Sequence, residues 1–286
     1  MITIFYHAHC ADGFAAAFAA WLVYGDRPGV RYLPVSCQPV PDLTDGHGKH
    51  TVYILDFSWP RAVLEALAAR ENVESVTVID HHQTAAADLE GIPYVDNARF
   101  SGGLRAFFDM TRSGAVLSWL HFHDDTVPEL FRYVQDRDLW QWRLTHSRAI
   151  SAALKLRKYR NFDSWRELLT GWEEHIKPRL VLEGSAIVEA EETMLDGLSE
   201  MREARFDGLR RPYVRCNSPV LQSELGDRLL RDDPDAAYAD VWAEWDGVRR
   251  HSLRARPGDE VDVSAIAKSH GGGGHRCAAG YTEVLP

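Results

Sequence analysis

The chain has 286 residues, of which 45% are hydrophobic and 26% charged, and its formal net charge at pH 7 is -10. These values are typical of a soluble globular protein with one or two domains. The acidic balance argues against a broad basic surface for long duplex nucleic acid, but it allows a local basic pocket for a short phosphorylated ligand.

The four cysteines (Cys10, Cys37, Cys216 and Cys277) are scattered and form no Cys-x-x-Cys pair. This spacing excludes a zinc knuckle or a disulfide framework and favours a reducing compartment. No apolar run approaches the length of a membrane span, and the N-terminus lacks a basic segment followed by an apolar one. We therefore expect a cytoplasmic protein with no membrane partner.

The first third of the chain alternates apolar strands, polar turns and helices. The predicted strands are short runs rich in β-branched residues, at 2–6, 30–35, 51–55, 76–79 and 92–95. An Ala-rich helix over 14–23 follows the first strand, and Pro60 begins a helix that extends to residue 69. This alternation predicts an α/β fold with an N-terminal, doubly wound parallel sheet.

The middle of the chain is predicted to be a helical extension of that domain. Apolar residues recur at helical spacing over 103–123, 127–142, 148–156 and 162–169. A long segment over 176–204, rich in Glu, Ala and Leu, predicts a helix that links two domains. The same helix also allows packing against a second copy, as in a homodimer.

The last part of the chain predicts a smaller α/β domain. The expected strands are 212–216, 238–244, 248–254 and 281–285, and the expected helices are 222–230 and 263–269. Trp245-Asp246-Gly247 predicts a hairpin turn between two of the strands. We therefore expect one domain over 1–175, a linker helix over 176–205 and a second domain over 206–286.

Acids and imidazoles follow three of the predicted strands. The candidate metal ligands are His7, His9, Asp12, Asp56, His81 and Asp136, with Asp80 and His82 beside them and Asp138 as the alternative to Asp136. The carboxyl ends of parallel strands meet at one edge of a sheet, so these side chains are expected to converge. Asp and His together suit Mn²⁺, Mg²⁺, Fe²⁺ or Zn²⁺, and Asp56 can bridge two ions.

Each of these acids also has an ordinary structural explanation. Asp12 and Asp56 both precede predicted helices, where an N-cap is the commoner role of an aspartate. Asp136 and Asp138 suit a solvated helix end. These structural roles do not explain why so many acids should lie at one edge of the sheet. The sequence therefore favours the metal site, while both interpretations stay open.

A run of four glycines near the C-terminus suggests an anion site. Glycines let backbone N–H groups approach a phosphate closely, and an arginine can bind it through two hydrogen bonds. The candidate substrate-binding residues are Arg254, Gly272, Gly273, Gly274, His275 and Arg276. The alternatives are a flexible linker for the glycines and an ordinary surface position for Arg254.

Taken in order, these residues resemble the DHH family of phosphoesterases with its DHH-associated C-terminal domain. The shared markers are His-x-x-Cys-x-Asp-Gly-Phe at 7–14, Asp56, Asp80-His81-His82, Asp136-Arg-Asp138, Ser252-Leu-Arg254, Val261-Asp-Val-Ser264, and Gly-Gly-Gly-Gly-His-x-x-Ala-Ala-Gly at 271–280. The resemblance covers nearly the whole chain.

The resemblance implies a phosphodiesterase or phosphomonoesterase that uses two metal ions, usually Mn²⁺. Its implied ligands are Asp12, Asp56, His81 and Asp136, with Asp56 bridging. It also implies that His82 meets the scissile phosphate and that Asp80 orients an imidazole. Arg254, His275 and the glycine backbone would clamp substrate in a cleft between the domains.

One departure from the family pattern concerns the first metal position. Many relatives carry two acids spaced as Asp-x-Asp, and Cys10 stands where the earlier acid is expected. Either His7 or His9, with or without Cys10, completes that position, or the centre holds one tight and one weak ion. A thiolate ligand would favour a softer ion such as Zn²⁺.

The expected substrates are short oligonucleotides or linear dinucleotides. The acidic net charge suits a small ligand better than a long strand. Phe57, Trp59, Trp140 and Trp142 lie near the predicted site, where they either stack a base or belong to the core. The alternatives are an exopolyphosphatase or nucleotide-bisphosphate phosphatase, and a catalytically decayed nucleotide-binding sensor, which Cys10 would permit.

Overall fold

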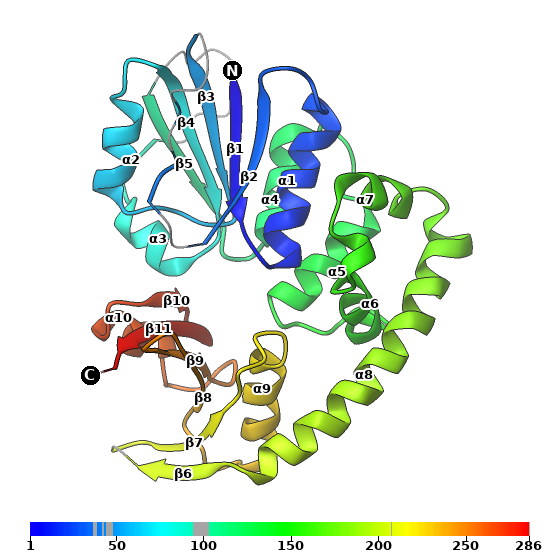
Figure 1. Cartoon of the computed structure of the whole chain (residues 1–286), viewed down its shortest axis with the longest axis vertical. Coiled ribbons are helices and arrows are strands. Elements are labelled where there is room, and N and C mark those ends of the chain that lie inside the picture. The colour runs from blue at the N-terminus through cyan, green and yellow to red at the C-terminus, as the bar shows by residue number, and fades with distance from the viewer. Residues whose placement is uncertain (37–38, 42, 44–47, 94–102, 207, 286) are drawn as a thin grey trace. The chain divides into compact units, whose positions relative to one another are not determined.

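The computed structural model describes residues 1–36, 39–41, 43, 48–93, 103–206 and 208–285. It divides into two compact units, Met1–Ile187 and Val188–Pro286 (Figure 1). The boundary between the units lies within the long helix α8 (Lys177–Glu200). Both units combine helices with a sheet, which confirms the expected α/β class. Among the helices in the described residues, none is both long and apolar enough to span a bilayer.

The first unit is built on a five-stranded sheet in the order β2-β1-β3-β4-β5. Its strands are β1 (Ile2–His7), β2 (Val30–Val35), β3 (His50–Leu55), β4 (Val73–Asp80) and β5 (Gly103–Phe108). Every neighbouring pair is parallel, as predicted. This order reverses direction between β1 and β3, and ligands of open α/β sheets bind outside the carboxyl ends of strands at such a point.

Helices cover both faces of this sheet (Figure 1). One face packs against α1 (Ala11–Tyr24) and α4 (Gly114–Phe122), where Ala16, Ala20 and Leu117 meet the strands. The other face packs against α2 (Arg61–Ala68), whose Leu64 and Leu67 are fully buried. Burying each such leucine contributes roughly 1.5–3 kcal/mol. The short helix α3 (Gln83–Asp88) follows β4.

The single helix predicted over 103–123 is wrong, because this segment forms β5 and then α4. Residues 103–108 pair in register with residues 75–80 of β4. The chain then turns where Asp109 accepts a hydrogen bond from the Thr111 N–H at 2.8 Å. Ser113 caps α4 by accepting from the Val116 N–H at 3.4 Å. Of the strand predicted over 92–95, Ile92 and Pro93 are not in a strand, and the remainder lies outside the described residues.

The helical extension packs against α1. It comprises α5 (Glu129–Asp138), α6 (Ser147–Leu154), the 3₁₀ turn Arg157–Tyr159, α7 (Phe162–Leu168) and the π-helical turn Trp172–Ile176. Phe18, Phe131 and Trp165 form the aromatic centre of this core. A Cβ at Gly184 would overlap the Ala149 carbonyl oxygen, so glycine lets α8 approach α6 closely.

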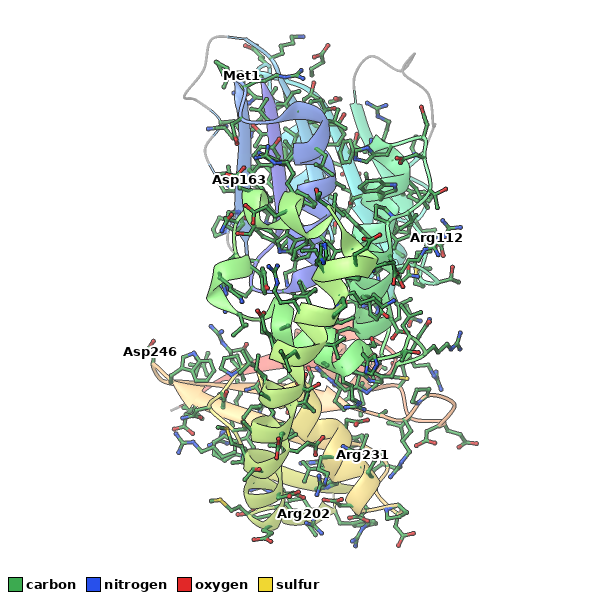
Figure 2. The ribbon with its side chains drawn as sticks, turned by 90° about the vertical axis from the view of Figure 1, so that its right-hand side faces the viewer. Met1, Arg112, Asp163, Arg202, Arg231 and Asp246 are labelled. Carbon is green, nitrogen blue, oxygen red and sulfur yellow. The ribbon has the colours of Figure 1, made fainter. Side chains whose placement is uncertain are left out.

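The second unit has a six-stranded mixed sheet in the order β10-β11-β9-β8-β7-β6. Its strands are β6 (Glu203–Phe206), β7 (Arg210–Arg215), β8 (Ala239–Trp245), β9 (Val248–Arg254), β10 (Gly273–His275) and β11 (Ala278–Val284). The helices are α9 (Gln222–Asp232) and α10 (Val263–Ser269). The predicted hairpin turn is present, but it has two residues rather than three, because Trp245 is the last residue of β8 and pairs with Val248. Asp246, at the tip of the β8–β9 turn (Figure 2), and Gly247 have φ of 55° and 73°, as a two-residue hairpin requires.

The long predicted helix over 176–204 ends earlier than expected. Helix α8 stops at Glu200, and Glu203–Phe206 becomes the edge strand β6, which pairs antiparallel with β7. The helical pattern is strong in this segment, but pairing with a strand further along the chain determines its last residues. The edge position of β6 leaves all four of its residues exposed.

Candidate metal centre

Asp56 lies at the centre of the site, directly after β3, and its two carboxylate oxygens face different groups of donors. Oδ2 is 3.4 Å from His7 Nδ1 and 3.4 Å from Cys10 Sγ. Oδ1 is 3.1 Å from His81 Nε2. Asp56 is 1% exposed and has a φ of 63°, a conformation that non-glycine residues adopt mainly where surrounding structure enforces it. A carboxylate divided in this way has the geometry of a bridging ligand.

The second group of donors surrounds His81. Its Nε2 lies 3.6 Å from Asp12 Oδ2 and 3.4 Å from Asp138 Oδ2, in addition to its contact with Asp56. Neighbouring ligands on an octahedral ion with bonds of about 2.1 Å lie about 3 Å apart, so the spacing fits a shared cation. Three carboxylates and one imidazole suit Mn²⁺ or Mg²⁺.

Asp12 lies in the first turn of α1, but its carboxylate is held by a different helix. Its carboxylate accepts hydrogen bonds from Gly114 N at 2.7 Å and Ala115 N at 3.0 Å, at the start of α4. The helix α1 is instead capped by Cys10, whose Sγ accepts from Gly13 N at 3.2 Å. A carboxylate has about four lone-pair positions, so capping α4 leaves Asp12 able to bind a cation.

Two residues that support this arrangement were missed by the sequence interpretation. A Cβ at Gly114 would lie 2.6 Å from both Cβ and Oδ1 of Asp56, so only glycine fits there. Ser113 before it is fully buried and caps α4. The available signal was the Ser-Gly pair that precedes an apolar helical run, a typical helix start.

Burial changes how readily the acids of this cluster ionise. Burial, with the neighbouring charge of Asp56, raises the pKa of Asp12 well above its usual range, and burial also raises the pKa of Asp138. Burial acts the same way on Asp56, but hydrogen bonds from His7 and His81 hold its pKa well below the usual range. Gathered acids without sufficient counter-charge are costly, and a divalent cation removes that cost.

His81 provides positive charge beside Asp12, Asp56 and Asp138. Burial lowers its pKa, but the hydrogen bond with Asp56 and the charges of the neighbouring acids outweigh this and raise the pKa to about 10. A protonated His81 therefore places positive charge against these three carboxylates. Binding of an ion requires His81 to give up that proton.

The structure brings Asp138 to the cluster and does not bring Asp136 there. Asp136 accepts hydrogen bonds from Arg143 N at 2.9 Å and Leu144 N at 3.2 Å, which fold the loop after α5 back onto the helix. Residues two apart on a helix point in different directions, so only one of the two acids can face the site. His9 is exposed and lies outside the donor groups identified among the described residues.

The loop after Asp138 presents two half-buried tryptophans. Trp140 and Trp142 have φ of 55° and 53°, and their rings are 5.0 Å apart. Arg137 lies 4.5 Å over the Trp140 ring, and Arg148 lies 4.5 Å over the Trp142 ring. Backbone strain at two bulky residues beside a candidate site is a feature associated with function.

The other two candidate aromatics belong to the core. Trp59 is 7% exposed and packs edge-to-face on Phe5 at 5.1 Å. Phe57 packs on Trp59 at 4.9 Å. The core interpretation therefore holds for this pair.

In the second unit, the glycine run forms part of the fold. Gly271, with φ of 78°, ends α10, and Gly272 N donates to Ala267 O at 2.8 Å, which is a Schellman helix end. A Cβ at Gly272 would overlap the Gly280 carbonyl oxygen, and Gly274 has φ of 139°. The β10–β11 hairpin therefore requires these glycines, and the flexible-linker alternative does not describe them.

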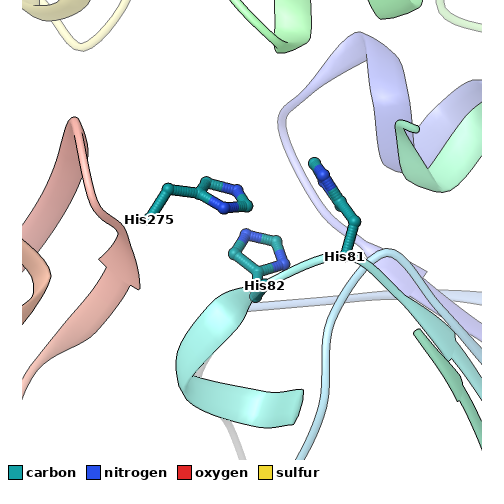
Figure 3. Close-up of side chains that lie close together, drawn as sticks. All are labelled: His81, His82 and His275. Carbon is teal, nitrogen blue, oxygen red and sulfur yellow. The ribbon is translucent and has the colours of Figure 1, made fainter. Parts of the chain in front are cut away.

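The two candidate arginines of the second unit are both held by hydrogen bonds. Arg254 donates to Ser223 Oγ at 2.5 Å and to Leu253 O at 2.8 Å. Arg276 donates to the carbonyl oxygens of Asp259 and Glu260, each at 3.0 Å, and thereby anchors the loop before α10. His275 is the last residue of β10, and its side chain is drawn in Figure 3.

No family model matches the chain. The uncharacterized protein R106 of Acanthamoeba polyphaga mimivirus is 28% identical over 296 residues, which covers 97% of this chain and 66% of that protein. The chain thus spans just under two thirds of the length of this relative.

Among solved structures, the DHH domain of a protein assigned to a family of ribosomal proteins superposes with a TM-score of 0.56. The sequences are 16% identical, and the match covers 99% of this chain and 82% of that one. This chain has the DHH fold. The resemblance expected from the ordered sequence markers is therefore confirmed at the level of the fold.

Two further DHH-type matches have lower scores. RecJ from Thermus thermophilus, in complex with Mn²⁺, has a TM-score of 0.49 at 13% identity and covers 100% of this chain and 49% of RecJ. The pGpG-specific phosphodiesterase PggH from Vibrio cholerae has a TM-score of 0.47 at 12% identity, over 99% and 93% of the two chains. Scores this low carry no weight for the chemistry of this chain, which depends on its own residues.

In the DHH fold of this chain, the Asp-His-His triplet divides into three separate positions after β4. Asp80 is fully buried and its Oδ1 lies 2.7 Å from His82 Nδ1. His81 faces the three carboxylates, and Figure 3 shows His81 and His82 projecting from the turn that leads into α3. Burial lowers the pKa of His82, but the charge of Asp80 and its hydrogen bond raise that pKa by more than burial lowers it. The pKa of His82 therefore lies above its usual value.

Proposed function

We propose that the chain is a metal-dependent phosphohydrolase, a phosphodiesterase that cleaves short oligonucleotides or linear dinucleotides. The observation that carries this proposal is Asp56, whose two oxygens face separate donor groups 3.4 Å and 3.1 Å away. Two ions bridged by a carboxylate are the usual arrangement for in-line attack of water on phosphorus.

The residues present fit two divalent cations, with Mn²⁺ as the expected metal and Mg²⁺, Fe²⁺ or Zn²⁺ as alternatives. Asp12, His81 and Asp138 would hold one position with Asp56 Oδ1, and His7 and Cys10 would hold the other with Asp56 Oδ2. Asp138 replaces Asp136 in this set. When bound, such ions lower the pKa of water and neutralise charge on the phosphate.

His82 is suited to act on the phosphate itself. Asp80 fixes its orientation through the 2.7 Å hydrogen bond to Nδ1 and favours the protonated imidazolium. The His82 side chain is 26% exposed, whereas His81 is 1% exposed. We assign His82 to contact a phosphate oxygen or to donate a proton to the leaving oxygen, and Asp80 to position it.

The tryptophan loop supports a substrate that carries a base. Trp140 and Trp142 follow Asp138 directly, and stacking of a nucleobase on an aromatic ring contributes about 1–3 kcal/mol. Arg137 and Arg148 over these rings add positive charge that suits a phosphate backbone. Polyphosphate has no base, so this loop favours nucleotides over the exopolyphosphatase alternative.

In the second unit, we propose that Arg254, His275 and the backbone of Gly272–Gly274 bind substrate phosphate. Arg254 is preorganised by its hydrogen bonds to Ser223 and Leu253. Arg276 is not included, because its guanidinium anchors the loop before α10. The scattered cysteines support a reducing, cytoplasmic compartment.

A substrate panel tests this proposal. The purified protein with Mn²⁺ is incubated with a linear dinucleotide, a longer single strand, a cyclic dinucleotide, a nucleotide bisphosphate and polyphosphate. We expect the dinucleotide or short strand to be cleaved fastest, and Trp140→Ala or Trp142→Ala to slow that cleavage selectively. Tight nucleotide binding without turnover of any substrate would instead identify a sensor.

A further inference from the structure

The three donors at the first metal position form a nearly equilateral triangle. The distances His7 Nδ1 to Cys10 Sγ, Cys10 Sγ to Asp56 Oδ2, and His7 Nδ1 to Asp56 Oδ2 are each 3.4 Å. Ligands on a tetrahedral zinc ion, with bonds of about 2.0–2.3 Å, lie about 3.3–3.6 Å apart. The donors are therefore already spaced as three corners of a tetrahedral site, and one of them is sulfur.

Local structure holds Cys10 in this position. It is the N-cap of the 14-residue helix α1, with extended backbone angles of -122° and 155°. Its Sγ accepts a hydrogen bond from Gly13 N at 3.2 Å. In the absence of metal the sulfur is a thiol donor toward Asp56, and a bound metal would displace its proton. Once a metal displaces that proton, the N–H donor and the helix N-terminus both stabilise the thiolate.

This site is accessible from the side of His7. The His7 side chain is 40% exposed, whereas the side chains of His81 and Asp12 are each 1% exposed. Three protein ligands with an accessible fourth position are typical of a catalytic zinc site rather than a structural one. The donors around His81 contain no sulfur and present one imidazole among three carboxylates.

We propose that His7, Cys10 and Asp56 form a thiolate-containing metal position that selects a zinc-like ion, while Asp12, His81 and Asp138 hold a harder ion such as Mn²⁺. The inference rests on the proposed function only in that Asp56 is shared by both positions. Thiolate selects Zn²⁺ and related ions, whereas carboxylate-rich sites suit Mn²⁺ and Mg²⁺. Binding at Cys10 forms a metal–sulfur bond and releases the thiol proton to solvent.

Cobalt spectroscopy tests the sulfur ligand without any substrate. Metal-free protein is titrated with Co²⁺, and we expect a sulfur-to-cobalt charge-transfer band in the near ultraviolet. The band should disappear in Cys10→Ser and Cys10→Asp. It should remain in the control Cys277→Ala, which removes another half-buried free cysteine from the second unit. Absence of the band in the wild type, or its survival in Cys10→Ser, would overturn the proposal.

Metal competition tests the selectivity. Wild-type protein is dialysed against equal concentrations of Zn²⁺ and Mn²⁺, and we expect the protein to retain both metals. In Cys10→Asp we expect the preference for Zn²⁺ over Mn²⁺ to fall at least about tenfold, with Mn²⁺ retained by the remaining donors. An unchanged ratio would contradict the proposal. Retained Mn²⁺ and an unaltered circular dichroism spectrum establish that the variant is folded, and neither readout depends on hydrolysis.

Discussion

Gly114 should be essential to the metal centre although it carries no side chain. It begins α4, and the Cβ added by Gly114→Ala would lie 2.6 Å from Cβ and Oδ1 of Asp56. Carbon atoms are not found so close, so either α4 or Asp56 must move. Asp56 has little freedom, because it is buried and already holds a φ of 63°. We expect the displacement to fall on the bridging carboxylate.

The size of this effect follows from overpacking. Inserting a methyl group into a close-packed site costs about 1–3 kcal/mol. If that strain opposes the arrangement that binds metal, affinity for Mn²⁺ falls about 5- to 150-fold, since about 1.4 kcal/mol corresponds to a factor of ten. Titration calorimetry of metal-free protein with Mn²⁺ measures the change, and thermal unfolding measures the accompanying loss of stability.

Gly197→Ala is the matched control. Gly197 lies inside helix α8, and a Cβ added there would meet nothing within 4 Å. Alanine in place of a helical glycine adds about 0.4–1 kcal/mol of stability. Binding of Mn²⁺ by Gly114→Ala as tight as that by Gly197→Ala would refute any role for the close approach of α4 to Asp56 in the metal centre.

Three other perturbations separate packing from metal binding. Gly184→Ala should lower the free energy of unfolding by about 1–3 kcal/mol in chemical denaturation, because its Cβ overlaps the Ala149 carbonyl; stability like that of Gly197→Ala would contradict this. Asp138→Asn should reduce the amount of bound Mn²⁺, measured by elemental analysis. Asp136→Asn should retain Mn²⁺ but raise the KM for a dinucleotide, because the loop that carries Trp140 and Trp142 is loosened. Equal metal loss in both variants would rule out this division of roles. Mn²⁺ at 100 times its Kd should stabilise the protein by about 2.7 kcal/mol relative to chelated protein, and an unchanged unfolding temperature would speak against a metal site.

Several elements could be predicted from the sequence because their signals are local. The bounds expected for β2, β9 and α10 agree with the structure. In α10 the start is determined by Asp262, which accepts from the N–H groups of Ser264 and Ala265. Polar residues after apolar runs likewise placed Asp56 and the Asp80-His81-His82 triplet at strand ends.

The features that escaped prediction depend on contacts distant in sequence. Residues 103–108 contain apolar residues at helical spacing, but they form a strand because β4 offers an open edge for pairing. The choice between Asp136 and Asp138 depends on the loop amides of Arg143 and Leu144, which capture Asp136. A glycine is required at position 114 only because Asp56, which follows β3, packs directly against it. No local sequence pattern reveals this contact.

The role of Cys10 also required the fold. In the sequence it appears as a departure from the expected Asp-x-Asp spacing, which leaves open a weakened site or a decayed enzyme. In the structure its sulfur stands 3.4 Å from both His7 and Asp56. These distances are the basis of our proposal that Cys10 changes the metal preference of that position rather than abolishing it.

The most direct test of the account is hydrolysis of a linear dinucleotide followed in the same sample as its metal content. Wild-type protein reconstituted with divalent metal should release mononucleotides, with the rate rising as the second equivalent of metal binds. Asp56→Ala should bind less metal and lose turnover while remaining folded. Hydrolysis at the wild-type rate by Asp56→Ala, or by fully chelated wild-type protein, would contradict the claim that Asp56 organises a two-metal phosphohydrolase.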